Sequence, residues 1–211
     1  MTSAGATTVA DLEGAIRAHV RAAEGVVDLL PAVHEVGSVL CGAFAAGNRL
    51  YAFGNGGSAA EAQHLVAEFV GRFHRTRRAL PAVSLTTDPS VVTCIANDFS
   101  FDSLFARQVT ALAGPGDVVV AFTTSGRSPN VVQGLAAARE RGAITVLFGA
   151  GDGADAAPLA DHLLLVRSDD TARVQEMHLL LLHLLSEIVD RWAEQTEIGT
   201  SASSSERPDG P

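Results

Sequence analysis

The side chains best suited to chemistry are a histidine and a glutamate four residues apart, His64 and Glu68. Their segment has a helical pattern, and residues i and i+4 of a helix lie on one face about one turn apart. An imidazole and a carboxylate in that arrangement can share a divalent metal ion or work as an acid–base pair. They can equally form an exposed hydrogen bond with no further role, so these two residues alone leave all three possibilities open.

Two more histidines, His178 and His183, occur in the leucine-rich segment RVQEMHLLLLH at residues 173–183. An imidazole buried without a hydrogen-bond partner is costly, so each of them requires one. For His178 we expect a core position with its hydrogen bonds satisfied. The segment by itself assigns no role to His183.

Two short loops are suited to hold an anion, GNGGS at residues 54–58 and TTSGRS at residues 123–128. Each follows a predicted strand and precedes a predicted helix, whose N-terminal N–H groups attract anions. Glycine lets the backbone approach a ligand closely, and the second loop carries four hydroxyl groups. The loops could instead be tight turns in which Ser58 and Ser128 cap the following helices, with Pro129 at the first helical position. Both descriptions can hold together.

The net charge indicates what kind of anion site to expect. The chain has 24 acidic and 15 basic residues, a formal charge of −9. A surface of that sign argues against nucleic acid as a partner. A bound phosphate would therefore depend on local N–H and hydroxyl groups and not on the overall field.

Alternating apolar runs and helical patterns predict the frame that positions these residues. Apolar residues at helical spacing give two N-terminal helices, 8–30 and 33–46, separated by Pro31. Asn97 and Asp98 fall in a loop between two later helices. The predicted strands are 49–53, 82–85, 117–122, 144–148 and 162–166, and the predicted helices after the first strand are 58–73, 89–96, 101–113, 128–141 and 171–194.

This alternation predicts an α/β fold, a three-layer doubly wound domain with a five-stranded parallel sheet and additional N-terminal helices. Strands that are apolar throughout are buried on both faces, as a parallel sheet requires. Ligands of such sheets bind at the carboxyl ends of the strands, where both loops lie. We expect residues 1–8 to be flexible, 9–195 to form the domain, and the Ser-rich segment 196–211 to be a disordered tail.

The composition also indicates a compartment. No uninterrupted apolar run reaches the roughly 18 residues of a membrane-spanning helix, and the N-terminus lacks the pattern of a secretory signal. Cys41 and Cys94 have no metal-binding spacing, so we expect two buried free thiols in a reducing cytoplasm. The sequence thus predicts a cytoplasmic protein with no membrane partner.

Taken together, four stretches resemble the SIS (sugar isomerase) family and, within it, the sedoheptulose 7-phosphate isomerases. They are GNGGSAAEAQHLVAEFVGRF, ANDFSFDSLFARQV, TTSGRSPNV and ARVQEMHLLLLH, and the resemblance covers about residues 9–194. It implies a flavodoxin-like five-stranded parallel sheet, a homotetramer, and one Zn²⁺ per subunit.

The resemblance also implies roles for individual residues. Glu68 and His183 match the pair that moves protons. Thr123 stands where serine is common, and Ala172 stands where some members carry an aspartate near the substrate. The positions that match metal ligands are His64, Glu68, Gln175 and His183. The positions that match substrate contacts are Asn55, Gly56, Gly57 and Ser58 in the first loop, Asn97 and Asp98 for the sugar, Thr123, Ser125 and Ser128 for the phosphate, and Thr124 and Gln175 beside them.

The implied reaction converts sedoheptulose 7-phosphate to a D-glycero-heptose 7-phosphate of manno configuration, for nucleotide-activated heptose biosynthesis. It needs a base for a carbon-bound proton and an acid for the oxygens, commonly through an enediol, and a metal can polarise the carbonyl. The alternatives are a non-catalytic tetrameric SIS scaffold that binds a protein partner, and an isomerase of another sugar phosphate. A scaffold has no need for four filled metal positions, which favours an enzyme.

Helix geometry adds an expectation about assembly. Gln175 and His183 are eight residues apart, or about 12 Å along a straight helix, whereas two ligands of one ion lie only about 4 Å apart. Either the helix is distorted or a neighbouring subunit supplies one ligand. Because the segment contains no Pro or Gly to kink it, we expect Glu68 and His183 of one site to come from different chains, with Leu179–Leu185 packed between them.

Overall fold

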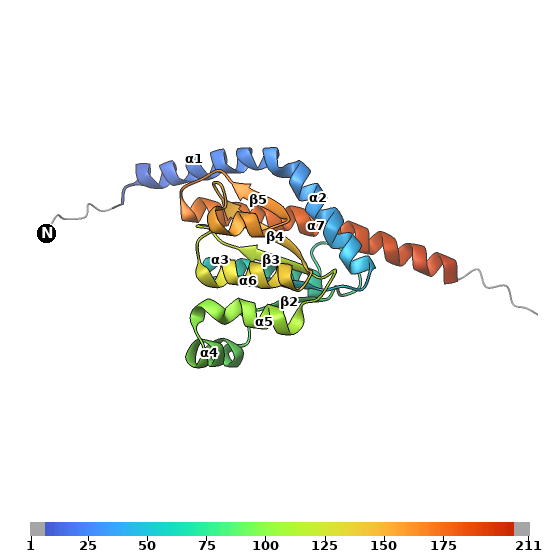
Figure 1. Cartoon of the computed structure of the whole chain (residues 1–211). Helices are drawn as coiled ribbons and strands as arrows, with labels where there is room; N and C mark the ends of the chain where they lie inside the picture. The colour runs from blue at the N-terminus through green and yellow to red at the C-terminus, as the bar shows by residue number, and fades with distance from the viewer. Residues whose placement is uncertain (1–6, 205–211) are drawn as a thin grey trace, which may run out of the picture.

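A five-stranded, all-parallel sheet with the strand order β2-β1-β3-β4-β5 forms the centre of the protein (Figure 1). The computed structural model describes residues 7–204, with side chains described to residue 196. Each strand begins and ends within two residues of its predicted bounds, so the predicted α/β fold is confirmed. The strands are β1 (Leu50–Gly54), β2 (Ala82–Ser84), β3 (Val118–Phe122), β4 (Ile144–Ala150) and β5 (His162–Val166).

Helices cover both faces of the sheet, and successive strand residues alternate between the two. In β1, Leu50 and Ala52 join one apolar core, and Tyr51 and Phe53 join the other. The first core is covered by α2 (Leu30–Ala45), α3 (Gly57–Val70) and α7 (Thr171–Ser204), and the second by α4 (Pro89–Asp98), α5 (Leu104–Leu112) and α6 (Pro129–Glu140). Short 3₁₀ helices are η1 (Val26–Leu29), η2 (Phe101–Ser103) and η3 (Ala154–Leu159).

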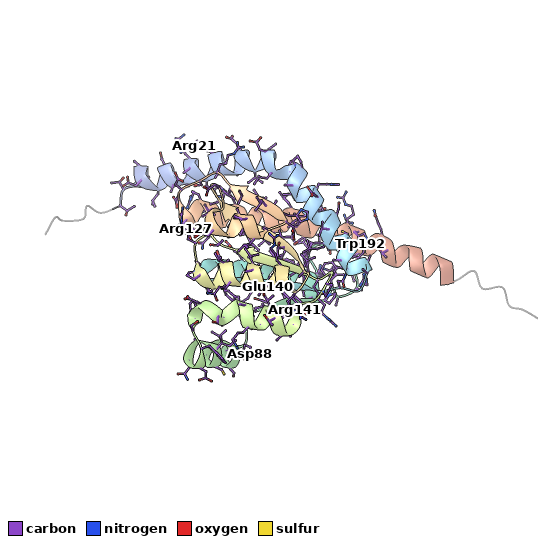
Figure 2. The ribbon with its side chains drawn as sticks, viewed as in Figure 1. Arg21, Asp88, Arg127, Glu140, Arg141 and Trp192 are labelled. Atoms are coloured by element: carbon purple, nitrogen blue, oxygen red, sulfur yellow. The ribbon has the colours of Figure 1, made fainter. Side chains whose placement is uncertain are left out.

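The two anion-binding loops predicted from the sequence lie at one edge of the sheet. Gly54 at the end of β1 is in register with Phe122 at the end of β3, so the segments 54–58 and 123–128 start side by side. Figure 2 marks this edge with Arg127, and the opposite end of α6 with Glu140 and Arg141. The edge is the carboxyl end of the strands, as expected for a ligand site.

The N-terminal helices break before Pro31. The 3₁₀ turn η1 separates α1 (Val9–Gly25) from α2, and Pro31 lies in the first turn of α2, where its missing N–H costs little. Thr8 was expected in a flexible terminus but caps α1, since its hydroxyl accepts from the Asp11 N–H at 3.2 Å and the Asp11 carboxylate accepts from the Thr8 N–H at 2.8 Å. The flexibility predicted for residues 1–6 lies outside the described residues.

By length and composition alone, the helical run Val9–Ala45 could cross a membrane. Core helices of soluble proteins pass the same test, and α2 packs as one: Val33, Val36, Leu40 and Phe44 are buried in the first core. α1 differs, because none of its residues is buried. It packs across the outside of α7 (Figure 1).

The last helix extends beyond its prediction. α7 continues to Ser204, beyond the predicted end at residue 194, and the disorder expected for residues 196–204 stays a prediction. No proline interrupts this stretch, and Ala, Glu and Gln in the preceding turns are good helix formers. The remaining tail prediction, residues 205–211, lies outside the described residues.

Candidate active site

The site is built on two helices that lie side by side, α3 and α7. A Cβ atom on Gly57 would lie 2.5 Å from Gln175 Nε2. One turn further on, His178 Nδ1 lies 3.4 Å from Glu61 Oε2, and the next contact along α3 joins His64 to His183. Residue numbers rise together on both helices, so α3 and α7 run parallel, and each turn of one faces the matching turn of the other.

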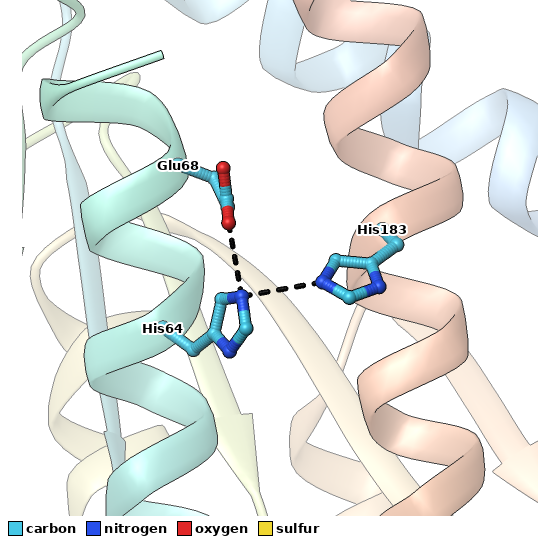
Figure 3. A group of neighbouring side chains, drawn as sticks. All are labelled: His64, Glu68 and His183. Atoms are coloured by element: carbon cyan, nitrogen blue, oxygen red, sulfur yellow. Dashed lines mark hydrogen bonds and ion pairs between the residues drawn. The ribbon is translucent and has the colours of Figure 1, made fainter. Parts of the chain in front are cut away.

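Three of the predicted metal ligands converge where these helices meet (Figure 3). His64 Nε2 lies 2.9 Å from Glu68 Oε1 and 3.2 Å from His183 Nε2. One ligand atom from each residue lies within 4.8 Å of the other two. The side chains of His64 and Glu68 are 40% and 18% exposed, so the group is accessible from one side. We call His64, Glu68 and His183 the triad.

The expectation that Glu68 and His183 come from different chains is wrong for the triad, because one chain contains all three residues. The alternative, a distorted helix, is not observed either, because α7 is one continuous α-helix from Thr171 to Ser204. Gln175 is the residue that lies apart, about two turns before His183 on α7. The apolar run Leu179–Leu185 also packs differently from the prediction: Leu181, Leu182 and Leu185 are buried within the chain's own core.

The triad suits a divalent metal by its donor chemistry. Two imidazole nitrogens and one carboxylate oxygen are a common ligand set of catalytic zinc, which leaves a fourth position open. His64 Nε2 and His183 Nε2 face each other at 3.2 Å, and two protonated nitrogens could not do so, so at least one lone pair points into the group. Burial, with a smaller effect from nearby His64, lowers the pKa of His183. A lowered pKa favours the neutral imidazole, the form that binds a metal or accepts a proton.

A pocket, which we call the cradle, lies at the carboxyl ends of the strands and is lined by residues of both loops. Asn55 and Asn130 tie the loops together by reciprocal amide hydrogen bonds of 2.9 and 2.8 Å. Gly126 has φ 65°, and a Cβ atom there would meet the Gly153 carbonyl, so the second loop needs glycine at its tip. The cradle is lined by Asn55, Ser58, Phe122, Thr123, Thr124, Ser125, Ser128 and Gln175.

The loop serines differ from their expected capping roles. Gly56 takes the N-cap position of α3 with φ 57°, and Ser58 lies buried within the first turn. Ser128 is the N-cap residue of α6, with Pro129 following, but its side chain makes no capping hydrogen bond. Both hydroxyls therefore line the cradle. Gly57 packs against Gln175, and the predicted approach of Gly56 and Gly57 to a ligand stays a prediction.

Asn97 and Asp98 do not line the cradle. They form the last turn of α4, not a loop, and both are exposed, with the Asn97 amide donating to Asp98 Oδ1 at 2.6 Å. Cys94, on the same helix, is also exposed, so the expectation of two buried thiols is wrong for it; Cys41 is half-buried, and both are free. Sugar contacts by Asn97 and Asp98 stay a prediction.

His178 occupies the core position that its segment suggested. It is fully buried, and its Nε2 lies 3.1 Å from the Gly149 carbonyl oxygen. Sequence reasoning missed its partner Glu61 and the bridging Asn130, both nearly fully buried. A buried acid among alanines on the predicted helix was the available signal for Glu61; nothing local marked Asn130.

Comparison with known proteins assigns the chain to a family. Residues 18–149 match the model of the SIS domain. The chain belongs to the SIS domain family.

Within the SIS domain family, the proteins similar to this chain include several phosphoheptose isomerases. That of Geobacter sp. (strain M21) is 47% identical over 184 residues, which cover 86% of this chain and 95% of the relative. That of Solidesulfovibrio magneticus is 55% identical over 150 residues, covering 71% and 73%. The solved phosphoheptose isomerase of Neisseria gonorrhoeae superposes with a TM-score of 0.81 at 36% identity, covering 85% of this chain and 97% of that one. This SIS protein is therefore an enzyme of the aldose–ketose isomerase type.

Proposed function

We propose that this SIS enzyme converts sedoheptulose 7-phosphate to D-glycero-heptose 7-phosphate of manno configuration, for nucleotide-activated heptose biosynthesis. The observation that carries the proposal is the convergence of His64, Glu68 and His183 at distances of 2.9 and 3.2 Å, in a chain about half identical to phosphoheptose isomerases over most of its length. A non-catalytic scaffold would have no use for this group.

The phosphate would be held in the cradle. Its hydroxyls and the N–H groups at the start of α3 and α6 provide hydrogen bonds without a positive side chain lining the pocket, which agrees with the acidic net charge of −9. Gln175 lines the same pocket from α7 and would contact the sugar. Its predicted role as a fourth metal ligand remains a proposal, since it lies about two turns from the triad in its own chain.

Glu68 and His183 would divide the proton transfers. In the ketose, a base removes a proton from C1 and an acid protonates the oxygen on C2, which gives the enediol. Removal of the proton from the C1 oxygen and protonation of C2 then give the aldose. The lowered pKa of His183 favours its neutral imidazole, whose one lone pair can either accept a proton or bind a metal. A bound Zn²⁺, held by His64, Glu68 and His183, would supply polarisation of the substrate carbonyl.

We further propose a cytoplasmic homotetramer with active sites at subunit interfaces and with neither nucleic acid nor membrane as a partner. The apolar side chains of α1 support self-association. Val9, Leu12, Ile16 and Val20 recur at helical spacing on a helix with no buried residue and are 48–73% exposed. Exposed Asn97 and Asp98, which do not line their own cradle, could then approach the substrate of a neighbour.

The test is to incubate pure protein with sedoheptulose 7-phosphate, with and without a strong chelator, and to identify the product by NMR. We expect a heptose 7-phosphate, near one divalent ion per chain, and loss of activity on chelation. Turnover that persists in metal-free protein would refute the metal, and turnover of a different sugar phosphate alone would refute the substrate.

A further inference from the structure

A buried arginine holds the end of α3. The last carbonyl groups of a helix lack partners within it, and the Arg77 guanidinium donates to two of them here, those of Glu68 and Phe69. Nη2 donates to the Glu68 carbonyl oxygen at 2.6 Å, and Nη1 donates to those of Phe69 and Gly71 at 2.7 and 3.0 Å. The Arg77 side chain is only 1% exposed. One guanidinium thus caps the turn that carries Glu68.

The same guanidinium is tied to α7 through Asp190. Arg77 Nε donates to Asp190 Oδ1 at 3.1 Å, and the Asp190 side chain is 2% exposed. Its second oxygen accepts from the N–H groups of His74 and Arg75 at 3.0 and 2.6 Å. Asp190 follows His183 by seven residues, which is two turns along one side of α7. The end of α3 is therefore joined to the helix that carries His183.

The triad lies between this ion pair and the contact of Glu61 with His178, which is also buried. A slide of α7 along α3 by one residue is a displacement of about 1.5 Å. It would strain the contacts on both sides of the triad together. Burying two charges is weak evidence for added stability, because desolvation offsets their attraction. Stability therefore does not account for the Arg77–Asp190 ion pair, whereas holding α3 and α7 in register would.

We propose that Arg77 and Asp190 are positioning residues: their ion pair fixes Glu68 against His183, and so controls metal affinity and turnover without touching metal or substrate. The inference rests on the proposed function, since it assigns the pair to that same triad. It predicts that metal binding and turnover change together, while binding of the sugar phosphate in the cradle does not.

The chain offers a matched control. Arg75 and Glu194 also join the loop after α3 to α7, at 2.8 Å, but their side chains are 33% and 36% exposed, whereas those of Arg77 and Asp190 are buried. We would compare Arg77→Met with Glu194→Gln by titration with Co²⁺, followed by its absorption bands, and by kcat and KM. We expect Arg77→Met to lower Co²⁺ affinity and kcat by about 10- to 100-fold, with KM within about twofold, and Glu194→Gln to match the wild type.

A second variant separates position from stability, because removing Arg77 alone leaves Asp190 buried without its partner. Arg77→Met combined with Asp190→Leu removes both charges, and such replacements often restore stability. We expect the melting temperature to recover while Co²⁺ affinity stays low, since the Glu68 carbonyl still lacks its donor. Recovery of both together, or a lower melting temperature with unchanged Co²⁺ affinity in Arg77→Met, would overturn the inference.

Failure of the proposed isomerase function can be told apart from failure of the positioning role of Arg77 and Asp190. If the wild type neither binds Co²⁺ nor turns over sedoheptulose 7-phosphate, that function is refuted, and the position of Glu68 is read directly from a crystal structure of the double variant. Displacement of Glu68 from His183 would support the inference. An unchanged triad would overturn it.

Discussion

The triad and the cradle are built in opposite ways. The triad consists of side chains on two long helices, each buried along one face and fixed by contacts on either side. The cradle consists of hydroxyl and N–H groups on two loops, held together by the amide pair of Asn55 and Asn130. Proton transfer depends on accurately placed side chains, whereas a phosphate accepts hydrogen bonds from several directions. The difference implies that mutations at the two places should separate turnover from binding.

The strongest way to break this comparison is Glu68→Gln. The amide keeps the size of the side chain but cannot accept a proton from carbon, so kcat should fall by about 10²- to 10⁴-fold. Steady-state kinetics would measure this, with binding of inorganic phosphate by calorimetry as the control for an intact cradle. A variant that turns over within a few-fold of the wild type would reduce Glu68 to a structural partner of His64.

In the cradle, replacing Ser125 and Ser128 by Ala should weaken binding of every sugar phosphate tested. A hydrogen bond to a charged group contributes about 1.5–3 kcal/mol, so KM should rise by about tenfold or more for each hydroxyl. Measuring KM for pentose, hexose and heptose phosphates checks it. A loss confined to one sugar would move these serines to the sugar end of the site.

The amide pair should give a smaller, mixed effect. Asn130→Ala leaves the Asn55 amide without its partner and should lower the free energy of unfolding by about 1–3 kcal/mol, because Asn130 is only 1% exposed. KM should rise less than in the serine variant, since no phosphate ligand is lost. Denaturant unfolding beside kinetics would show this, with Asn130→Asp, which keeps an acceptor for Asn55, as the control. A fall in kcat with unchanged KM would contradict the assignment of turnover to the triad and of phosphate binding to the cradle.

The pH dependence of stability should show the smallest effect. Burial lowers the pKa of His183 below its ordinary value of 6.5, so below about pH 6.5 the unfolded chain binds more protons at this residue than the folded one. Its contribution to stability is present above that pH and is lost as the pH falls through the lowered folded pKa. Thermal melts of chelated protein from pH 5 to 8 should therefore show a steeper acid decline for wild type than for His183→Gln. Equal slopes would mean that the imidazole titrates as if exposed.

The sequence alone determined the sheet, the loops and the placement of His64 beside Glu68, because these signals are local, whereas the roles of Gln175 and His183 came only from the resemblance to the SIS family. Short uninterrupted apolar runs rich in valine, such as residues 118–122, are typical of strands buried on both faces, and a glycine loop between a strand and a helix indicates the end of the sheet where ligands bind. His64 and Glu68 share a helix face at any position of the helix in the fold. The same locality explains the misplaced ends, since neither η1 nor the last turns of α7 carry a strong breaker.

Only the tertiary structure decided which residues meet across helices. Spacing along α7 showed that Gln175 and His183 could not easily share one ion, but it could not show which of the two lies beside His64. That depends on the parallel packing of α3 and α7, which is set by contacts between residues more than 100 positions apart, such as Glu61 with His178 and Arg77 with Asp190. A charged residue in a sequence does not reveal whether it is solvated or buried, because the partner that makes burial affordable is supplied by the fold.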